Sequence, residues 1–144
     1  MTATARVEVA IALVFRERSV LVTQRAAGVH LGGFWEFPGG KLRGDESPEA
    51  CAVREVFEET RVVVAARARR AVVEWDYPER KVLLHPIECD WLAGDGELVE
   101  VADLAWATSG ALRALAFPPA NAELVRELLA SGRLDYTGDH SYRS

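Results

Sequence analysis

Residues 40–62 read GKLRGDESPEACAVREVFEETRV, a glycine-containing segment followed by a run rich in carboxylates. Its run Arg54–Glu59 is predicted to be helical, and at about 100° per residue Glu55, Glu58 and Glu59 then lie within one narrow arc. Like charges at this spacing repel each other by roughly 0.2–0.5 kcal/mol per pair, so the helix needs a compensating cation. Carboxylate oxygens are hard ligands, which favour Mg²⁺ or Mn²⁺.

The residues before this arc define the start of the helix. Ser47 can cap it, Pro48 suits the first helical position, where no amide hydrogen is needed, and Glu49 suits the positive end of the helix dipole. The side opposite the carboxylates is predicted to face the core through Ala50, Val53 and Phe57.

The carboxylates have an alternative explanation as a solvated helix face, which is the usual reason for a cluster of charges. The preceding turn, Glu36–Lys41, favours a binding site instead, because paired glycines allow the backbone to approach a ligand or ion closely. Cys51 lies one turn before Glu55 and is either a ligand for a soft metal or a small residue beside this turn.

The spacing of these residues resembles the signature of the Nudix hydrolases, in which Gly is followed by Glu after five residues and by Arg-Glu-x-x-Glu-Glu after seven more. The matching residues are Gly40, Glu46, Arg54, Glu55, Glu58 and Glu59, with Val62 as the terminal apolar residue. Arg61 departs from the pattern, because the family usually has a glycine there that closes the helix in a left-handed conformation. The resemblance implies an α/β fold, a Nudix-type α/β/α sandwich with a mixed central sheet.

Length and composition indicate one domain, residues 1–130, followed by a polar C-terminal tail, residues 131–144. The net charge of −5 provides no basic field for polymeric nucleic acid, so a small nucleotide is the better partner. Two cysteines without Cys-x-x-Cys spacing indicate reduced thiols in a cytoplasmic protein. We expect no membrane span and no secretory signal, and no protein partner is indicated.

The rest of the chain alternates strand-like runs and turns. The predicted strands are residues 7–14, 19–25, 62–65, 71–75, 81–85 and 97–106. The first two are expected to pair, and Pro86 suggests an edge or a bulge. Residues 121–130 carry apolar side chains at helical spacing, and we expect this second helix to close the domain.

Within the superfamily, the chain is similar to the MutT-type diphosphatases, which remove oxidised guanine nucleotides. The similar stretches are Arg25-Ala26-Ala27 with His30, Trp35–Lys41, Tyr77–Arg80 and Phe117–Asn121. The resemblance implies that Asn121 contacts the modified base, since one amide can accept from N7–H and donate to O6 of 8-oxoguanine. The alternative is that Asn121 caps the last helix.

The resemblance also implies the other site residues. A metal ion would be held by the Gly39 carbonyl, Glu58, Glu59 and Glu100, with Glu97 and Asp103 as rivals for the last position. Glu55 would be the general base for the attacking water, and Arg54 with Glu46 would hold the loop and the helix in register. Arg25 and His30 would contact the phosphates. Phe37 and Tyr77 would line the base site beside Arg80, unless the aromatic rings belong only to the core and His30 only to the surface.

The predicted activity is therefore that of a metal-dependent nucleoside triphosphate pyrophosphohydrolase of MutT type. We expect it to convert oxidised guanine nucleotides (8-oxo-dGTP) to the monophosphate and pyrophosphate. One alternative within the same fold is hydrolysis of another nucleotide, such as a cytidine nucleotide or a nucleotide-sugar. An alternative from a different class is a nucleotide-sensing module without catalysis, which would not need all three helix carboxylates.

Overall fold

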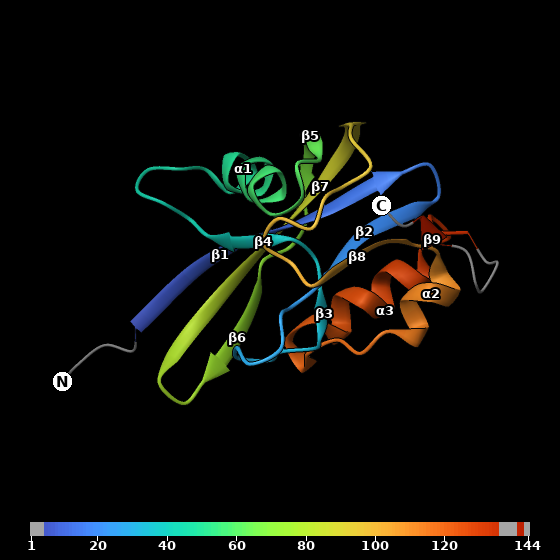
Figure 1. Cartoon of the computed structure of the whole chain (residues 1–144). Helices are drawn as coiled ribbons and strands as arrows, with labels where there is room; N and C mark the ends of the chain where they lie inside the picture. Colours follow the sequence, from blue (N-terminus) through green and yellow to red (C-terminus); the bar gives the residue numbers. More distant parts are fainter. Residues whose placement is uncertain (1–4, 136–140, 143–144) are drawn as a thin grey trace.

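The structure of the chain is a computed structural model that describes residues 5–135 and 141–142 (Figure 1). In chain order its elements are β1 (Ala5–Arg16), β2 (Ser19–Gln24), β3 (Trp35–Glu36), β4 (Gly39–Lys41), α1 (Pro48–Thr60), β5 (Val63–Arg69), β6 (Val73–Tyr77), β7 (Arg80–Ala93), β8 (Asp103–Ala107), α2 (Ser109–Ala114), a 3₁₀ turn (Pro119–Asn121), α3 (Ala122–Ala130) and β9 (Ser141–Tyr142).

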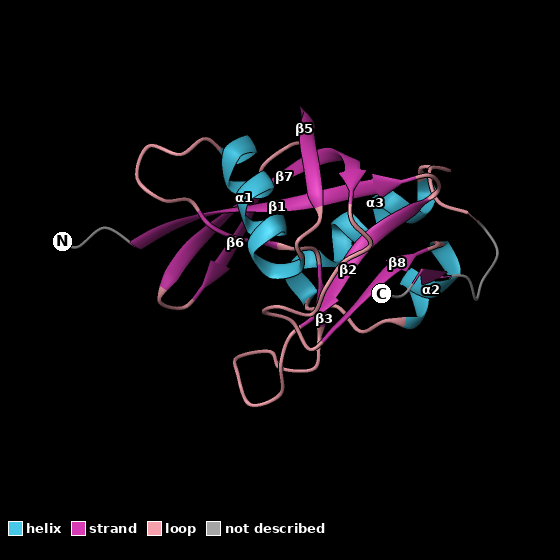
Figure 2. Ribbon diagram, turned by 45° about the horizontal axis from the view of Figure 1, so that its top comes forward, coloured by secondary structure: helices cyan, strands magenta, loops and turns pink. Residues whose placement is uncertain are grey.

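The strands form one mixed sheet with the order β5-β7-β1-β2-β8-β9, to which β3, β4 and β6 add by pairing with β2, β1 and β7. β1 and β7 run parallel, whereas the other strand pairs are antiparallel. Helix α1 covers one face of the sheet, and helices α2 and α3 cover the other (Figure 2). The predicted α/β/α sandwich with a mixed central sheet is confirmed.

The middle of β1 is buried on both faces because it lies between these helices. Side chains alternate along a strand, so neighbouring residues enter different layers of the core. Ala12 shares a buried cluster with Val56 of α1, whereas Leu13 shares the opposite cluster with Leu128 of α3. The continuous apolar run 10–15 is typical of a strand that is covered on both sides.

A fork between β1 and β2 positions the glycine-rich turn. The two strands pair beside their connecting turn, at Phe15↔Val20 and Arg16↔Ser19, as expected. Farther along, residues 35–41 lie between the strands and pair with β2 through β3 and with β1 through β4. The turn is therefore fixed by backbone hydrogen bonds on both sides, and its strand β4 contacts helix α1.

Helix α1 begins as predicted, because the Ser47 side chain accepts a hydrogen bond from the Ala50 amide at 3.1 Å. Of its predicted core face, Val53 packs against the core, but Phe57 and Ala50 are wrong, since Phe57 is 45% exposed and Ala50 is exposed. The buried stripe instead follows i, i+4, i+7 spacing through Ala52, Val56 and Glu59. The carboxylates therefore border the core, and one of them lies within it.

Arg61 closes helix α1 in the left-handed conformation that the family's glycine usually adopts, with φ of 62°. Its amide donates to the Phe57 carbonyl at 2.9 Å, and its guanidinium donates to the same carbonyl at 3.2 Å. The guanidinium also lies 5.1 Å from the centre of the exposed Phe57 ring. These contacts offset a left-handed strain of about 1 kcal/mol, so Arg61 closes the helix without a glycine.

The predicted strand bounds differ most from the structure at β7 and β8. β7 continues through Pro86, where its outer partner changes from β6 to β5, so the missing proline amide leaves no ladder bond broken. The Arg70 amide donates to the Pro86 carbonyl at 2.9 Å at this change of partner. The later strand begins only at Asp103, because the amides of Glu97 and Glu100 are bound instead by the end of helix α1.

The structure also differs from the sequence-based expectation in its short elements and after residue 130. The sequence did not indicate β3, β4 or α2, whereas the closing helix is confirmed as α3, preceded by the 3₁₀ turn. The expected loose tail is wrong for the described residues after 130, since Leu134 is buried and β9 pairs with β8. The domain boundary at residue 130 stays a prediction. Within residues 5–135 and 141–142, no helix has the length and apolar composition needed to cross a membrane.

Candidate active site

Two adjoining cavities lie at the open end of the fork. The first, which we call the Asn121 pocket, has a volume of about 310 Å³. It is lined by all six residues predicted to contact a substrate: Arg25, His30, Phe37, Tyr77, Arg80 and Asn121. The second, which we call the acidic pocket, has a volume of about 320 Å³.

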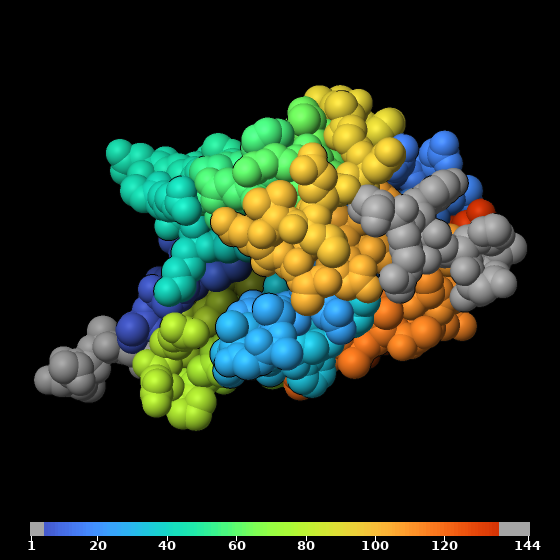
Figure 3. Space-filling model, viewed as in Figure 1, coloured from blue at the N-terminus to red at the C-terminus, as the bar shows by residue number. Residues whose placement is uncertain are grey.

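The acidic pocket is lined by carboxylates from three parts of the chain: Glu36 on β3, Glu55 and Glu59 on α1, and Glu100 before β8. Arg25, Glu36 and Gly39 line both cavities, so they form the boundary between them. On the face shown in Figure 3, the loop after β2 (blue) lies against the residues before β8 (orange), beside the β6–β7 turn (yellow-green).

Arg54 holds the loop before helix α1 against the helix. Its Nε and Nη2 donate to the two carboxylate oxygens of Glu46 at 2.6 and 2.8 Å. Its Nη1 donates to Glu55 at 2.5 Å and to Glu58 at 3.2 Å. The hydrogen bonds from Arg54 lower the pKa of Glu46 to about 2. The pair that the sequence predicted between loop and helix is therefore present, and Arg54 also fixes the position of Glu55.

The two glycines of the turn are needed because other groups occupy the space of a side chain. A Cβ atom at Gly39 would overlap the Ala10 carbonyl oxygen and lie 2.8 Å from Ile11 Cα. At Gly40 it would overlap the Glu55 carboxylate, with Glu55 Cδ only 2.6 Å away. Gly40 therefore makes room for the carboxylate to lie directly on the backbone of β4.

Glu59 is the most perturbed carboxylate of the site. It is 8% exposed, and its Oε2 accepts a hydrogen bond from the Gly39 amide at 3.1 Å. Burial, together with the nearby Glu36, Glu55 and Glu100 carboxylates, raises its pKa to about 8, although the Gly39 amide opposes the shift. This crowding of negative charge is the physical reason to expect a cation in the pocket.

Glu36 is a site residue that sequence reasoning left without a role. Burial raises the pKa of Glu36. The positive charge of Arg25, whose Nη1 lies 3.3 Å from Glu36 Oε1, offsets part of this rise. Thr23 pairs with Glu36 across β2 and β3, so the two side chains share one face. Thr23 Oγ1 is buried and has no hydrogen-bond partner among the described residues. The two-residue strand β3 is too short to show the alternation of side chains in the sequence.

Glu100 reaches the acidic pocket, whereas its rivals Glu97 and Asp103 do not line it. The Glu100 amide donates to the Glu59 carbonyl at 3.2 Å, which places the two acidic residues side by side. The Asp103 carboxylate instead accepts a hydrogen bond from the Leu104 amide at 2.7 Å. Of the three acids that the sequence offered, Glu100 is therefore the one the structure brings to Glu59.

The fit of the pocket to a cation is electrostatic, without a preformed cage. No group of three or more His, Cys, Asp or Glu side chains in the described part of the chain is arranged to hold a metal ion. Arg54 and Arg43 engage Glu58, whose Oε2 lies 3.5 Å from Arg43. Cys51 does not line the acidic pocket, and its buried thiol, whose pKa burial raises to about 11, donates to the Gly40 carbonyl at 3.4 Å, which favours the alternative of a small residue beside the turn.

The Asn121 pocket is built from the core outward. Phe37 is 1% exposed and stacks on Phe117 with ring centres 5.4 Å apart, so it is both a core residue and a pocket wall. Asn121 is buried at the start of α3, yet its side chain caps no helix amide. Arg25 is held by the His30 carbonyl at 2.8 Å, while the exposed His30 side chain lies at the rim.

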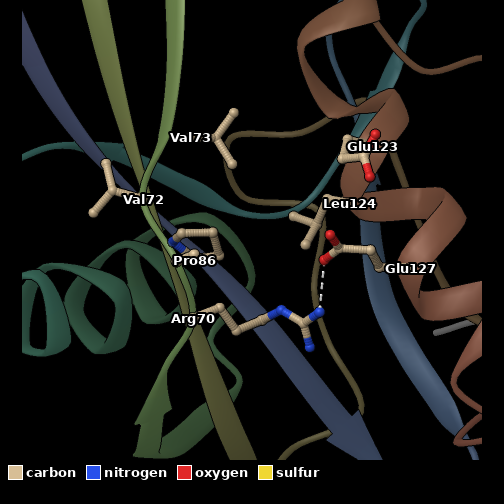
Figure 4. Close-up of a pocket in the computed structure, with 8 residues that line it drawn as sticks. Arg70, Val72, Val73, Pro86, Glu123, Leu124 and Glu127 are labelled. Atoms are coloured by element: carbon tan, nitrogen blue, oxygen red, sulfur yellow. Dashed lines mark hydrogen bonds and ion pairs between the residues drawn. The ribbon is translucent and has the colours of Figure 1, made fainter.

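A third cavity, of about 340 Å³, lies between α3 and the segment that joins β5 to β6 (Figure 4). Its central Arg70 is paired with Glu127 at 2.8 Å and with Glu88 at 3.0 Å. Val72, Val73, Pro86 and Leu124 form its apolar walls. Because the charge of Arg70 is already balanced by Glu88 and Glu127, whereas four carboxylates converge in the acidic pocket, we place the active site at the fork.

The sheet, the acidic helix and the adjoining pockets define a hydrolase of the Nudix class. A family model described as NUDIX domain matches residues 10–127, and the chain belongs to this family of hydrolases. Its fold is shared with a solved MutT protein from Methanosarcina mazei Go1, with a TM-score of 0.77 and 22% identity over 89% of this chain and 96% of that chain.

Relatives named 8-oxo-dGTP diphosphatase come from Proteus vulgaris, 41% identical over 69 residues, and Escherichia coli (strain K12), 29% identical over 124 residues. The alignments cover 48% and 85% of this chain, and 62% and 96% of the two relatives. A third relative, the CTP pyrophosphohydrolase of Escherichia coli (strain K12), is 30% identical over 118 residues, which are 82% of this chain and 86% of the relative.

The raised pKa of Glu59 leads to a prediction about stability without divalent cations. Between its unfolded value of 4.5 and its folded value of about 8, the folded state binds more protons, so wild-type stability falls as pH rises. Glu59→Gln keeps an acceptor for Gly39 and removes the proton equilibrium. As the pH is raised from 5 to 8, we expect the free energy of unfolding of Glu59→Gln to rise, relative to that of wild type, by on the order of a few kcal/mol.

The measurement is urea unfolding in the presence of a chelator across this pH range. Glu58→Gln is the matched control, and it should keep the wild-type slope because Glu59 remains. A Glu59→Gln variant whose stability runs parallel to wild type would contradict the assignment of the buried charge.

Proposed function

We propose that the chain is a metal-dependent nucleoside triphosphate pyrophosphohydrolase of MutT type, with oxidised guanine nucleotides (8-oxo-dGTP) as substrates. The observation that carries the proposal is the boundary shared by the two cavities. A pocket with aromatic walls and a buried amide adjoins a pocket of four carboxylates across Gly39, Glu36 and Arg25. A base in the first pocket would direct its phosphate chain into the second.

The ligands for Mg²⁺ or Mn²⁺ come in this proposal from the acidic pocket and from Glu58, which lies beside Glu59 on helix α1 but does not line the pocket. Glu59, Glu58 and Glu100, together with the Gly39 carbonyl, would hold the cation. When bound, it would neutralise the phosphate chain and the leaving pyrophosphate. Hard oxygen donors suit these ions, and the raised pKa of Glu59 supports the need for positive charge there. Arg25 would turn from Glu36 toward the phosphates, since a guanidinium matches phosphate geometry.

Glu55 is the proposed general base for the attacking water. Its carboxylate lies on the backbone of Gly40 and is fixed through Oε2 by Arg54, at the wall of the acidic pocket. Arg54 is in turn held by both oxygens of Glu46, so the base has a supported orientation. A positioned base of this kind contributes about a hundredfold or more to a hydrolysis rate.

Asn121 is the proposed reader of the base. Its amide can accept from N7–H and donate to O6 of an oxidised guanine at once, whereas ordinary guanine presents a bare N7 that faces the amide oxygen acceptor to acceptor. The burial of Asn121 supports this role, because an unmet polar pair costs about 1–3 kcal/mol in a dry pocket. Phe37 and Tyr77 would pack against the base, with Arg80 and His30 at the rim.

Such an activity would keep oxidised guanine out of DNA by clearing the nucleotide pool. The two free, buried cysteines support a cytoplasmic location. The second candidate substrate is a cytidine nucleotide, which the relative named CTP pyrophosphohydrolase favours. The presence of Glu55 and Glu59 in the pocket, with Glu58 beside them on helix α1, argues against a sensing module without catalysis.

For Glu55→Gln we expect nucleotide binding to persist and the chemical step to slow by about a hundredfold or more, because the amide cannot take a proton from water. Calorimetric titration of the nucleotide gives the affinity, and single-turnover measurements give the rate of the chemical step. If binding is lost while the rate at saturation is unchanged, Glu55 is a ligand and not the base.

For Asn121→Ala we expect the preference for 8-oxo-dGTP over dGTP to fall by about ten- to a hundredfold, because only the oxidised base uses both halves of the amide. The measurement is the ratio of kcat/KM for the two nucleotides before and after the substitution. Phe117→Leu, which alters the stacking partner of Phe37 and leaves the amide in place, is the control. An unchanged ratio in Asn121→Ala, or no preference in the wild-type enzyme, contradicts the substrate assignment.

A further inference from the structure

The segment that carries Glu100 is held in place by aromatic and charged side chains outside the two pockets. We call residues 94–102, between β7 and β8, the Glu100 loop. It begins at Gly94, whose φ of 91° turns the chain away from β7 and toward the end of helix α1. A Cβ atom at Gly94 would lie 3.3 Å from the Arg61 carbonyl oxygen, so the loop passes close to the C-terminus of this helix.

Two indole groups bind the first carbonyls of the Glu100 loop. Trp91 Nε1 on β7 donates to the Gly94 carbonyl at 2.6 Å, and Trp106 Nε1 on β8 donates to the Asp95 carbonyl at 2.9 Å. Arg16, at the end of β1, lies 4.1 Å from the Trp91 ring centre and 5.3 Å from that of Trp106. Its Nη2 is 2.9 Å from the Asp95 carboxylate. Three strands of the sheet thus bind two consecutive residues of the loop.

The far side of the loop is bound by backbone groups next to the acidic pocket. The Glu97 amide donates to the Thr60 carbonyl at 2.8 Å, and the Glu100 amide donates to the Glu59 carbonyl at 3.2 Å. The Ala102 amide donates to the Gln24 carbonyl at 2.9 Å, where the loop meets β2. The loop has no strand pairing of its own, so these contacts determine where the Glu100 side chain lies.

We propose that Arg16, Trp91, Asp95 and Trp106 form a clamp that positions Glu100 for cation binding, an inference that rests on the proposed role of Glu100 as a ligand. None of these four residues lines the acidic pocket, so they act through the loop. The clamp fixes the start of the loop to the sheet, and the loop then presents Glu100 beside the buried Glu59. Without it, the carboxylate would have to be ordered at the moment of binding, which costs affinity.

The test uses a double variant, Trp91→Phe with Asp95→Ala. Phenylalanine keeps an aromatic ring beside Arg16 and removes the indole donor, and the Asp95 side chain is 76% exposed, so the core is preserved. We expect Mn²⁺ binding to the metal-free protein, followed by calorimetry, to weaken about tenfold, as for other residues that orient a metal ligand. Amide hydrogen exchange should rise in residues 97–101 and stay unchanged in helix α1.

The same substitutions in a Glu100→Gln background separate positioning from a general structural effect. If the clamp acts through Glu100, Mn²⁺ affinity falls in Glu100→Gln and falls no further when Trp91→Phe and Asp95→Ala are added. Asp90→Ala is the matched control, because Asp90 also has an exposed carboxylate paired with an arginine, Arg67, yet lies outside the loop. It should leave Mn²⁺ affinity unchanged, and Asp95→Asn should retain part of the wild-type affinity.

An equal loss of affinity from the clamp substitutions in both backgrounds overturns the inference and leaves the role of Glu100 intact. No loss in the wild-type background overturns it as well. If Glu100→Gln itself binds Mn²⁺ as tightly as wild type, the assignment of Glu100 to the cation fails, and the positioning role fails with it.

Discussion

The hydrogen bond from the Gly39 amide to the buried Glu59 carboxylate joins the two halves of the site. Gly39 belongs to the turn inside the fork of the sheet, and Glu59 belongs to the buried stripe of helix α1. A side chain at Gly39 would overlap the backbone of β1, so the close approach of turn and strand requires glycine. The rest of the site depends on this contact, because it fixes the distance between the turn and the acidic helix.

Arginine side chains balance part of the negative charge of the site, and a cation bound with the substrate would balance the rest. Arg54 engages Glu46, Glu55 and Glu58, which leaves Glu59 among the carboxylates of the acidic pocket. Burial and these neighbours raise the pKa of Glu59 to about 8. Its carboxyl group therefore holds a proton near neutral pH. A divalent cation would replace that proton, and the pocket would then attract the phosphate chain.

Much of the fold was predictable because its signals are local. The capping residue Ser47, the periodicity of helix α1 and the apolar run of β1 each depend on neighbours in sequence. The core face of α1 was not predictable in this way, because the apolar Phe57 is exposed and the acidic Glu59 is buried. The Gly39 amide accommodates a buried acid, and Arg61 covers an exposed ring. Short paired strands such as β3 and β4 carry too few residues to show a period.

For the site, the sequence motif indicated the glycines and the helix carboxylates. The positions of Glu100 and Glu36 depend on the topology. Glu100 could not be separated from Glu97 and Asp103 by spacing, because the choice depends on backbone hydrogen bonds to the end of helix α1. Glu36 was part of the quoted turn without a role, and its place in both pockets follows from pairing of β3 with β2. Long-range pairing of this kind leaves no local trace in the chain.

The most direct test of the two-pocket site is hydrolysis of a nucleotide panel, namely 8-oxo-dGTP, dGTP and CTP, by the purified protein with and without Mg²⁺. Separate detection of pyrophosphate and phosphate reports which anhydride bond is cleaved. We expect Mg²⁺-dependent release of pyrophosphate and monophosphate, with the highest kcat/KM for 8-oxo-dGTP. Release of phosphate in place of pyrophosphate, turnover that persists without divalent cations, or higher kcat/KM for CTP would contradict the proposed activity.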